Sequence, residues 1–238
     1  MNPTLILCPA YNHNNQTLWQ AAINRGWDVE RLLTYRVPDT MKDIADPVLY
    51  IQALFAPTIA KDFGIELKEP PNDWMAKLPV EFSKRKIVLT TMAEARQMGT
   101  GFYKPPNDKS FKAFVGTGLN LPDGTDDEPV LVSNPVTWDQ EFRCFLLDGK
   151  IQTLSRYYSK GTLCFNPITD HERVRIETFV SDVVAATKLP KSVVMDVGTI
   201  DGEWAVVELN AAWGSGIYEC NPHAVLDCIH VCCMEGRL

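Results

Sequence analysis

Residues 193–210 read Val-Val-Met-Asp-Val-Gly-Thr-Ile-Asp-Gly-Glu-Trp-Ala-Val-Val-Glu-Leu-Asn. Two apolar, β-prone runs flank an Asp-Gly pair, a composition that predicts a β-hairpin. Three polar side chains interrupt these runs: Asp196, Glu208 and Asn210. Because carboxylate and amide oxygens are ligands that Mg²⁺ accepts, the hairpin predicts a metal site if all three lie on one face. The alternative is a surface hairpin whose acidic side chains are simply solvated.

The length of the hairpin loop decides which side chains share a face, because a register shift of one residue exchanges the two faces. A three-residue loop at 200–202, with Gly202 in the left-handed conformation, would pair Asp196 with Val206 and place Asp196 diagonal to Glu208. One face would then carry Val194, Asp196, Val206, Glu208 and Asn210, and the other the apolar set Met195, Val197, Ala205, Val207 and Leu209. A two-residue loop at 201–202 breaks this segregation, so the sequence favours the longer loop.

The bulk composition excludes several classes of protein. The net charge of −7 argues against non-specific nucleic-acid binding. The chain has no apolar run long enough to span a membrane, and its first residues lack the basic segment of a signal peptide. The seven cysteines include no Cys-x-x-Cys pair, so we expect reduced thiols in a cytoplasmic protein and no zinc site. Nothing in the composition indicates the oligomeric state.

The order of predicted elements divides the chain into three parts, 1–79, 80–130 and 131–238. A strand at 5–8, a helix at 18–25 and a strand at 27–34 predict a small α/β lobe. A helical stretch at 46–63, divided by Pro57, and a proline-rich linker at 68–78 follow. The later elements are a helix at 92–98, strands at 102–104 and 130–133, a helix from Asp170 to about 188, and a last helix with Pro222 at its first position.

A second hairpin is predicted around Asp148-Gly149, the preferred pair for a two-residue type I′ turn. This turn pairs Leu147 with Lys150 and, in an unbroken register, Glu141 with Arg156. Glu141, Arg143 and Arg156 then share one face, together with Lys150 and Gln152. Such a cluster is either a cross-strand salt bridge on a solvated sheet or an oxyanion site, because the planar arginine fork binds phosphate and carboxylate groups bidentately.

A basic loop precedes these hairpins in the chain. Residues 103–111 read Tyr-Lys-Pro-Pro-Asn-Asp-Lys-Ser-Phe. Lys104 ends a predicted strand, and Lys109 with Ser110 and the loop backbone can supply further donors to a polyphosphate. The alternative is an exposed basic loop, because lysine is nearly always exposed.

The order of these motifs resembles the ATP-grasp superfamily, and most closely its small, divergent RimK-like proteins. The resemblance runs from about residue 78 to 216 and rests on Glu141-Phe-Arg143, Arg156, Asp196 and Glu208-Leu-Asn210. It implies an α+β ATP-grasp fold, in which two α+β lobes with antiparallel sheets sandwich ATP. The small α/β lobe at the N-terminus would precede them.

The resemblance also implies a role for each candidate residue. The residues Lys104, Arg85 (or its neighbour Lys84), Lys109 and Ser110 match nucleotide contacts, and Glu141 also belongs to the nucleotide site. Leu131 and Val132 lie in the strand whose backbone would read adenine. Asp196, Glu208 and Asn210 match ligands of Mg²⁺, or of Mn²⁺. Arg156 and Arg143 match residues at the γ-phosphate and the acyl phosphate. Pro105 and Pro106 stand where many relatives have glycines.

The activity implied is that of an ATP-dependent carboxylate–amine ligase, which forms an amide or peptide bond through an acyl-phosphate intermediate. Its partners would be a carboxylate-bearing small molecule or peptide and an amine. No protein nucleophile is required, which agrees with the absence of a triad signature in the sequence. Two alternatives stay open: a non-catalytic nucleotide-binding protein with a regulatory or interaction role, and a phosphotransferase on the same fold.

Overall fold

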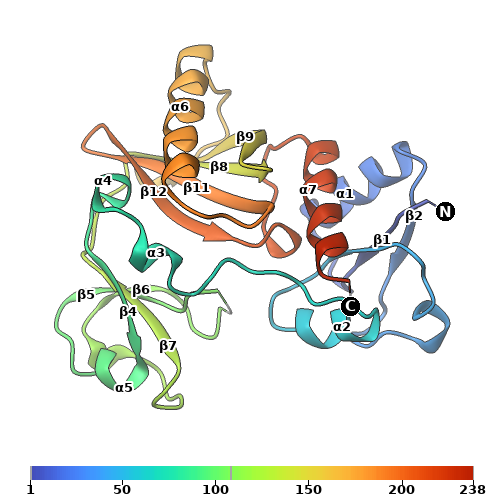
Figure 1. Ribbon diagram of the computed structural model, residues 1–238, viewed down its shortest axis with the longest axis horizontal. Helices are drawn as coiled ribbons and strands as arrows, with labels where there is room; N and C mark the ends of the chain where they lie inside the picture. Colours follow the sequence, from blue (N-terminus) through green and yellow to red (C-terminus); the bar gives the residue numbers. More distant parts are fainter. Residues whose placement is uncertain (1, 108, 238) are drawn as a thin grey trace.

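A computed structural model describes residues 2–107 and 109–237, whose strands form three sheets (Figure 1). The N-terminal lobe holds a parallel sheet in the order β2-β1-β3. Its elements are β1 (Thr4–Leu7), α1 (His13–Asn24), β2 (Asp28–Arg31), the 3₁₀ turn η1 (Asp39–Met41), β3 (Pro47–Tyr50) and α2 (Ala56–Asp62). Every residue of β1 is buried, as expected for the central strand of a parallel sheet.

The stretch 46–63, predicted to be helical, contains a strand and a shorter helix instead. The apolar run at 47–51 is too short for a helix and becomes β3, while Pro57 lies in the first turn of α2, where its missing N–H costs nothing. The first helix also begins earlier than predicted, at His13. Asn12 caps it by accepting a hydrogen bond from the backbone N–H of Asn15 at 2.9 Å.

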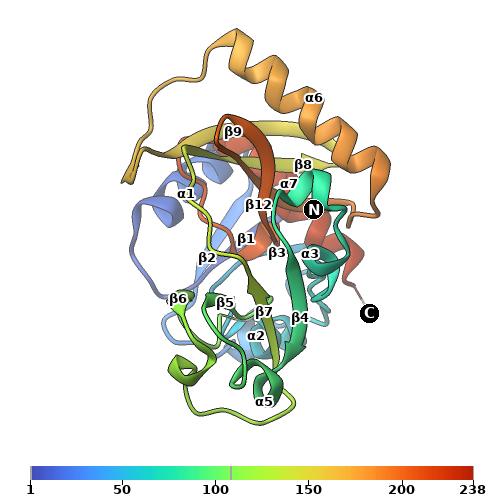
Figure 2. The ribbon, with the colours of Figure 1, turned by 90° about the vertical axis from the view of Figure 1, so that its left-hand side faces the viewer.

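The central part of the chain forms an antiparallel sheet in the order β4-β7-β5-β6 (Figure 2). Its elements are α3 (Trp74–Lys77), α4 (Val80–Ser83), β4 (Ile87–Thr91), α5 (Met92–Ala95), β5 (Gly101–Lys104), β6 (Phe114–Gly116), η2 (Gly118–Asn120) and β7 (Pro129–Ser133). The predicted boundary between 130 and 131 falls inside β7. The two antiparallel sheets are separated by the connection at 134–139, and the three-part division stays a prediction.

The C-terminal part forms a second antiparallel sheet in the order β10-β9-β8-β11-β12. Its elements are β8 (Gln140–Leu147), β9 (Lys150–Ser159), β10 (Thr162–Leu163), α6 (Asp170–Ala186), β11 (Ser192–Ile200), β12 (Glu203–Asn210), η3 (Ala212–Gly214) and α7 (Pro222–Glu235). Thr169, rather than Asp170, caps α6 through a capping box with Glu172. The last helix begins as predicted, with Pro222 in its first turn.

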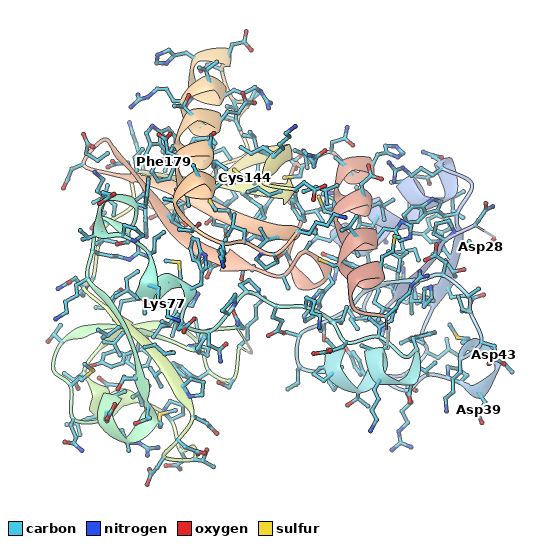
Figure 3. All side chains as sticks on the ribbon, viewed as in Figure 1. Asp28, Asp39, Asp43, Lys77, Cys144 and Phe179 are labelled. Carbon is cyan, nitrogen blue, oxygen red and sulfur yellow. The ribbon has the colours of Figure 1, made fainter. Side chains whose placement is uncertain are left out.

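Two helices cover this second sheet in different ways. Helix α6 packs on its outer face, where Cys144 of β8 and Phe179 of α6, both labelled in Figure 3, belong to one apolar cluster. Helix α7 lies between the second sheet and the N-terminal lobe (Figure 1), and its side chains share a core with β1, β3, Phe145 and Val194. Helix α7 therefore covers the part of the face opposite α6 that carries Phe145 and Val194, and the rest of this face is available for a site. Within the described residues, no helix is long and apolar enough to cross a membrane.

The strand pairing that forms the polar face of the β11–β12 hairpin differs from the pairing predicted from the sequence. Its loop has two residues, Asp201 and Gly202, both with positive φ, so the predicted three-residue loop is wrong. A β-bulge at Val207 then shifts the pairing by one more residue, so that Asp196 lies directly opposite Glu208. The predicted faces exchange before the bulge: Val206 pairs with Val197 in the buried core, and Ala205 pairs with Gly198 on the Asp196 side.

The hairpin of β8 and β9 is also irregular. The Asp148-Gly149 turn and the pairing of Leu147 with Lys150 are confirmed. An irregularity between Phe145 and Leu146 shifts the register and pairs Arg156 with Phe142, so the prediction that Arg156 shares a face with Glu141 is wrong. Its guanidinium carbon lies 5.1 Å from the Phe142 ring centroid, and the group pairs with Glu172 of α6 on the covered side of the sheet. A turn sets the register only up to the first bulge.

Candidate functional site

A cleft lies between the central sheet and the uncovered face of the second sheet. A cavity of about 230 Å³ opens where the sheets meet, and its walls are Arg85, Phe102, Lys104, Ala113, Val115, Ser133, Asn134, Pro135, Val136, Trp138, Val207 and Glu208. A second cavity, of about 380 Å³, shares Lys104 and Glu208 with the first and is also lined by Lys109, Lys112 and Asn210. The cleft therefore has an apolar end beside the 134–138 segment and a lysine-rich end beside the two polar residues of β12.

Glu208 is the centre of the lysine-rich end. The ammonium group of Lys104, at the end of β5, donates to Glu208 Oε2. The Asn210 amide Nδ2 donates to Oε1 of the same carboxylate at 2.9 Å. Burial opposes the charge of Glu208, but Lys104 and Asn210 outweigh this effect and lower the pKa of Glu208 to about 2. Glu208 is therefore a permanent anion that faces a lysine from the opposite sheet.

Asp196 is fully buried beside Glu208 and is held by Arg143 of β8. The Arg143 guanidinium donates from Nε to Oδ1 at 2.9 Å and from Nη2 to Oδ2 at 2.6 Å. Its Nη1 donates to the Gly216 carbonyl at 2.9 Å. Burial raises the pKa of Asp196, and the ion pair with Arg143 opposes this rise. Arg143 thus joins Asp196 to the loop that follows β12.

Two tyrosines extend this cluster toward solvent. Tyr157 and Tyr218 stack with ring centroids 4.7 Å apart, and the Arg143 guanidinium lies 4.8 Å from the Tyr218 centroid. The Tyr157 hydroxyl donates to Glu141, whose pKa is raised by burial against the lowering effect of this bond. Neither tyrosine was singled out from the sequence, because stacking across β9 and the loop after β12 depends on the tertiary fold.

Arg85 connects the apolar end of the cleft to β12. Its Nη1 and Nη2 donate to the carbonyls of Val206 and Val207 at 2.9 and 2.8 Å. The same guanidinium lies 5.1 Å from the Trp138 ring centroid, and burial lowers the pKa of Arg85 to about 10, which leaves it charged at neutral pH. Its neighbour Lys84 pairs with the exposed Glu203 instead. Of the two basic candidates, only Arg85 lines the cleft.

Most of the residues predicted from the sequence converge on this cleft, but two placements differ. Arg156 lies on the opposite face of the second sheet, as described above. Leu131 and Val132 lie in β7, a central strand whose backbone pairs with β4 on one side and β5 on the other. The backbone of both residues is hydrogen-bonded within the sheet and does not offer edge groups to a base, while Leu131 itself lines a small cavity with Arg85, Phe102 and Lys104. Ser110 is exposed beside Lys109 in the loop after β5.

The segment that the sequence reasoning missed is the connection 134–138 between the two sheets. Asn134, Pro135, Val136 and Trp138 line the apolar end of the cleft. The available signal was Asn134-Pro135, a pair that ends a strand and opens a connection. Gly198 lets Trp138 approach β11, because a Cβ at this position would lie 2.8 Å from the indole and 2.5 Å from the Gln140 carbonyl oxygen.

The donor set of the lysine-rich end fits a hard divalent cation. In the described part of the chain, no three His, Cys, Asp or Glu side chains are grouped to hold a metal. The candidate set instead combines two carboxylates, Asp196 and Glu208, with the Asn210 amide. Oxygen ligands of this kind suit Mg²⁺. The bond from Asn210 to Glu208 uses the amide nitrogen and does not consume its carbonyl oxygen.

Comparison with solved structures identifies the fold. A D-alanine–D-alanine ligase from Bacillus anthracis, solved with ATP, matches with 14% identity and a TM-score of 0.51 over 99% of this chain and 97% of that chain. The ATP-grasp ligase PsnB in complex with its minimal precursor matches with 14% identity and a TM-score of 0.52 over 98% and 100%. PsnB with a phosphomimetic variant of the minimal precursor, Mg and ADP matches with 13% identity and a TM-score of 0.51 over 98% and 99%.

At this level of identity the solved structures establish a common fold, with a parallel N-terminal sheet followed by two antiparallel sheets. No curated protein matches the chain in sequence. The family model described as an ATP-grasp domain, family 2 of the R(2)K clade, matches residues 82–228. This match is more than half of the 238 residues and includes every proposed ligand of the cleft from Arg85 to Asn210. The chain therefore belongs to the ATP-grasp domains, in family 2 of the R(2)K clade.

Proposed function

We propose that this chain is an ATP-dependent ligase that joins a carboxylate to an amine through an acyl phosphate. The observation that carries the proposal is the meeting of Lys104 from one sheet with Glu208 and Asn210 from the other, beside the buried Asp196–Arg143 pair. Two anions, a polyphosphate and a carboxylate, must approach each other in such a reaction, so the site needs both cations and a metal. The family and the ligases of similar fold support this assignment.

In this proposal Glu208 and Asn210, with Asp196 beside them, hold Mg²⁺ or Mn²⁺. Lys104 and Lys109 contact the phosphates, and the 134–138 connection with Phe102 and Val207 encloses the base. Bound MgATP supplies the phosphoryl group that activates the carboxylate. Lys104 neutralises Glu208; a metal held by Glu208 would supply the counter-charge in its place, and Lys104 would then contact the phosphates. Glu141 stays assigned to the nucleotide, while Arg156 is left out because α6 covers its side of the sheet.

Arg143 takes a different role from the one predicted. Three of its N–H groups bind Asp196 and Gly216, so we assign it to positioning the metal ligand and the loop after β12. The amine and the carboxylate are proposed to bind between this loop and the N-terminal lobe, where the Tyr50 hydroxyl donates to the Ser215 carbonyl at 2.9 Å. One of the PsnB structures contains a minimal precursor, and we propose peptides, along with amino acids, as candidates for the substrate.

The proposal is tested by a screen for ATP-dependent phosphate release over amino acids and short peptides, singly and in pairs. We expect release that requires a carboxylate and an amine together, with a product whose mass equals the sum of the two less one water. Phosphate release that does not depend on the carboxylate or the amine, or a product that gains a phosphoryl group, would contradict ligation. The second result would instead identify a phosphotransferase.

Gly198→Ala is expected to weaken MgATP binding on the order of tenfold, because overpacking costs about 1–3 kcal/mol. The new methyl group would collide with the Trp138 indole and the Gln140 carbonyl, and Trp138 would move into the apolar end of the cleft. Isothermal titration calorimetry measures the change. Gly99→Ala is the matched control, since nothing lies within 4 Å of a Cβ there. Equal MgATP affinities of Gly198→Ala and Gly99→Ala would show that Trp138 does not contact the nucleotide.

A further inference from the structure

The loop after β5 carries two prolines where a flexible phosphate-covering loop would carry glycines. Pro105 and Pro106 are both buried, and each fixes its own φ near −65°. Proline also restricts the residue before it to extended conformations, and Lys104 is indeed the last residue of β5. The first half of the loop is therefore stiff, and it starts at the lysine that contacts Glu208.

Asn107 ties this stiff segment to the linker between the N-terminal lobe and the central sheet. Its amide Nδ2 donates to the Pro70 carbonyl oxygen and to Asn72 Oδ1, both at 2.7 Å. Figure 1 shows this linker running from α2 toward α3 between the lobes. The two bonds connect segments 35 and 37 residues apart in the chain, so they fix the position of the loop and not only its local shape.

The linker itself is anchored on both sides of the contact with Asn107. The Trp213 indole Nε1 donates to the Lys68 carbonyl at 3.1 Å, and the Trp74 indole Nε1 donates to the Lys188 carbonyl at 3.0 Å. Trp213 lies in η3, just after the candidate metal ligands of β12, and Lys188 lies between α6 and β11. Asn107 thus bonds to a linker that the C-terminal part of the molecule contacts at Lys68 and at Trp74. Through these contacts it fixes the position of the segment 104–107.

Lys109, in the second half of the loop, lies at the lysine-rich end of the cleft. Lys109 has a φ of 56°, and it lines the cavity that Lys104, Glu208 and Asn210 also line. Asn107 and Lys109 also line a smaller cavity with Asn210 and Gly214. Lys104 and Lys109 therefore line one cavity of about 380 Å³, and the Asn107 contacts fix the part of the loop that begins at Lys104.

We propose that Asn107 is a positioning residue that holds the segment 104–107, which begins at Lys104, in place for the phosphates before the nucleotide binds. The inference rests on the proposed function, because it assigns the held loop to the phosphates of ATP. The loop then loses little conformational entropy on binding, unlike a glycine-rich lid.

The test compares Asn107→Ala with wild type by calorimetric titration of MgATP, MgADP and adenosine. Loss of two hydrogen bonds is expected to weaken MgATP and MgADP about tenfold, and to leave adenosine affinity unchanged because the base and ribose do not contact the loop. Asn72→Ala removes one of the two acceptors and is expected to fall between wild type and Asn107→Ala. These measurements use the full chain.

Asn2→Ala is the matched control for stability. The Asn2 amide donates to the Gly26 carbonyl at 2.8 Å in the N-terminal lobe, so Asn2→Ala removes a side-chain hydrogen bond without touching the cleft. Equal MgATP affinities for wild type and Asn107→Ala would overturn the inference, as would an equal loss for adenosine, which indicates general damage. Failure of wild type to bind MgATP would instead overturn the proposed function, so the two failures are distinguishable.

Discussion

Glu208→Gln is expected to reduce Mg²⁺-dependent ATP turnover by on the order of 10²-fold or more, because it removes a permanent anion from the lysine-rich end of the cleft. The lowered pKa of Glu208 keeps this carboxylate charged at neutral pH. Glutamine keeps the size of the side chain and can still contact Asn210, so the fold should survive. The measurement is the phosphate-release rate as a function of Mg²⁺ concentration, with the carboxylate and amine that the screen identifies.

Glu203→Gln is the matched control for this variant. Glu203 begins the same strand, β12, but it is exposed and pairs with Lys84 outside the cleft. Turnover of Glu203→Gln should equal that of wild type. Wild-type turnover by Glu208→Gln, with the same dependence on Mg²⁺, would show that β12 does not hold the metal.

Arg143→Met is expected to lower the free energy of unfolding by about 3–5 kcal/mol. The variant leaves the fully buried Asp196 carboxylate without its bidentate partner, and it also leaves the Gly216 carbonyl without this donor. Methionine fills a similar volume, so the loss comes from the unpaired charge and not from a cavity. Urea-induced unfolding, followed by circular dichroism, measures the difference.

Two further variants separate this explanation from a general effect of losing an arginine. Arg25 also pairs bidentately with an aspartate, Asp227, but on the surface, and Arg25→Met should cost no more than about 1 kcal/mol. The double variant Arg143→Met with Asp196→Asn should recover part of the stability, since the buried charge is gone. A double variant less stable than Arg143→Met alone would contradict the account.

Local sequence signals predicted the parts of the site that a few neighbouring residues determine. Asp148-Gly149 sets its turn through two positive φ angles, and Pro222 fixes the start of α7. The choice of Asp196, Glu208 and Asn210 followed from polar residues in apolar strands. Their common face was predicted correctly but for the wrong reason, because it depends on the bulge at Val207 and not on the loop.

The rest could not be predicted because it depends on contacts between distant segments. The bulge at Val207 lets Val206 enter the core opposite Val197, a packing choice made by the whole sheet. A similar irregularity, between Phe145 and Leu146, places Arg156 on the covered face. The contact between Asn107 and Pro70 joins two loops whose sequences give no sign of each other. The sequence therefore indicated which groups gather in the cleft more reliably than it indicated how each one is held there.

The central claim is that the cleft between the two antiparallel sheets binds ATP together with a divalent metal. The most direct test is a calorimetric titration of ATP into the wild-type chain, with Mg²⁺ and then with EDTA. We expect one ATP per chain in the presence of Mg²⁺, and an affinity at least about tenfold lower when the metal is removed, because the metal neutralises part of the repulsion between Glu208, Asp196 and the phosphates. No binding, or binding of equal affinity with and without Mg²⁺, would contradict the account.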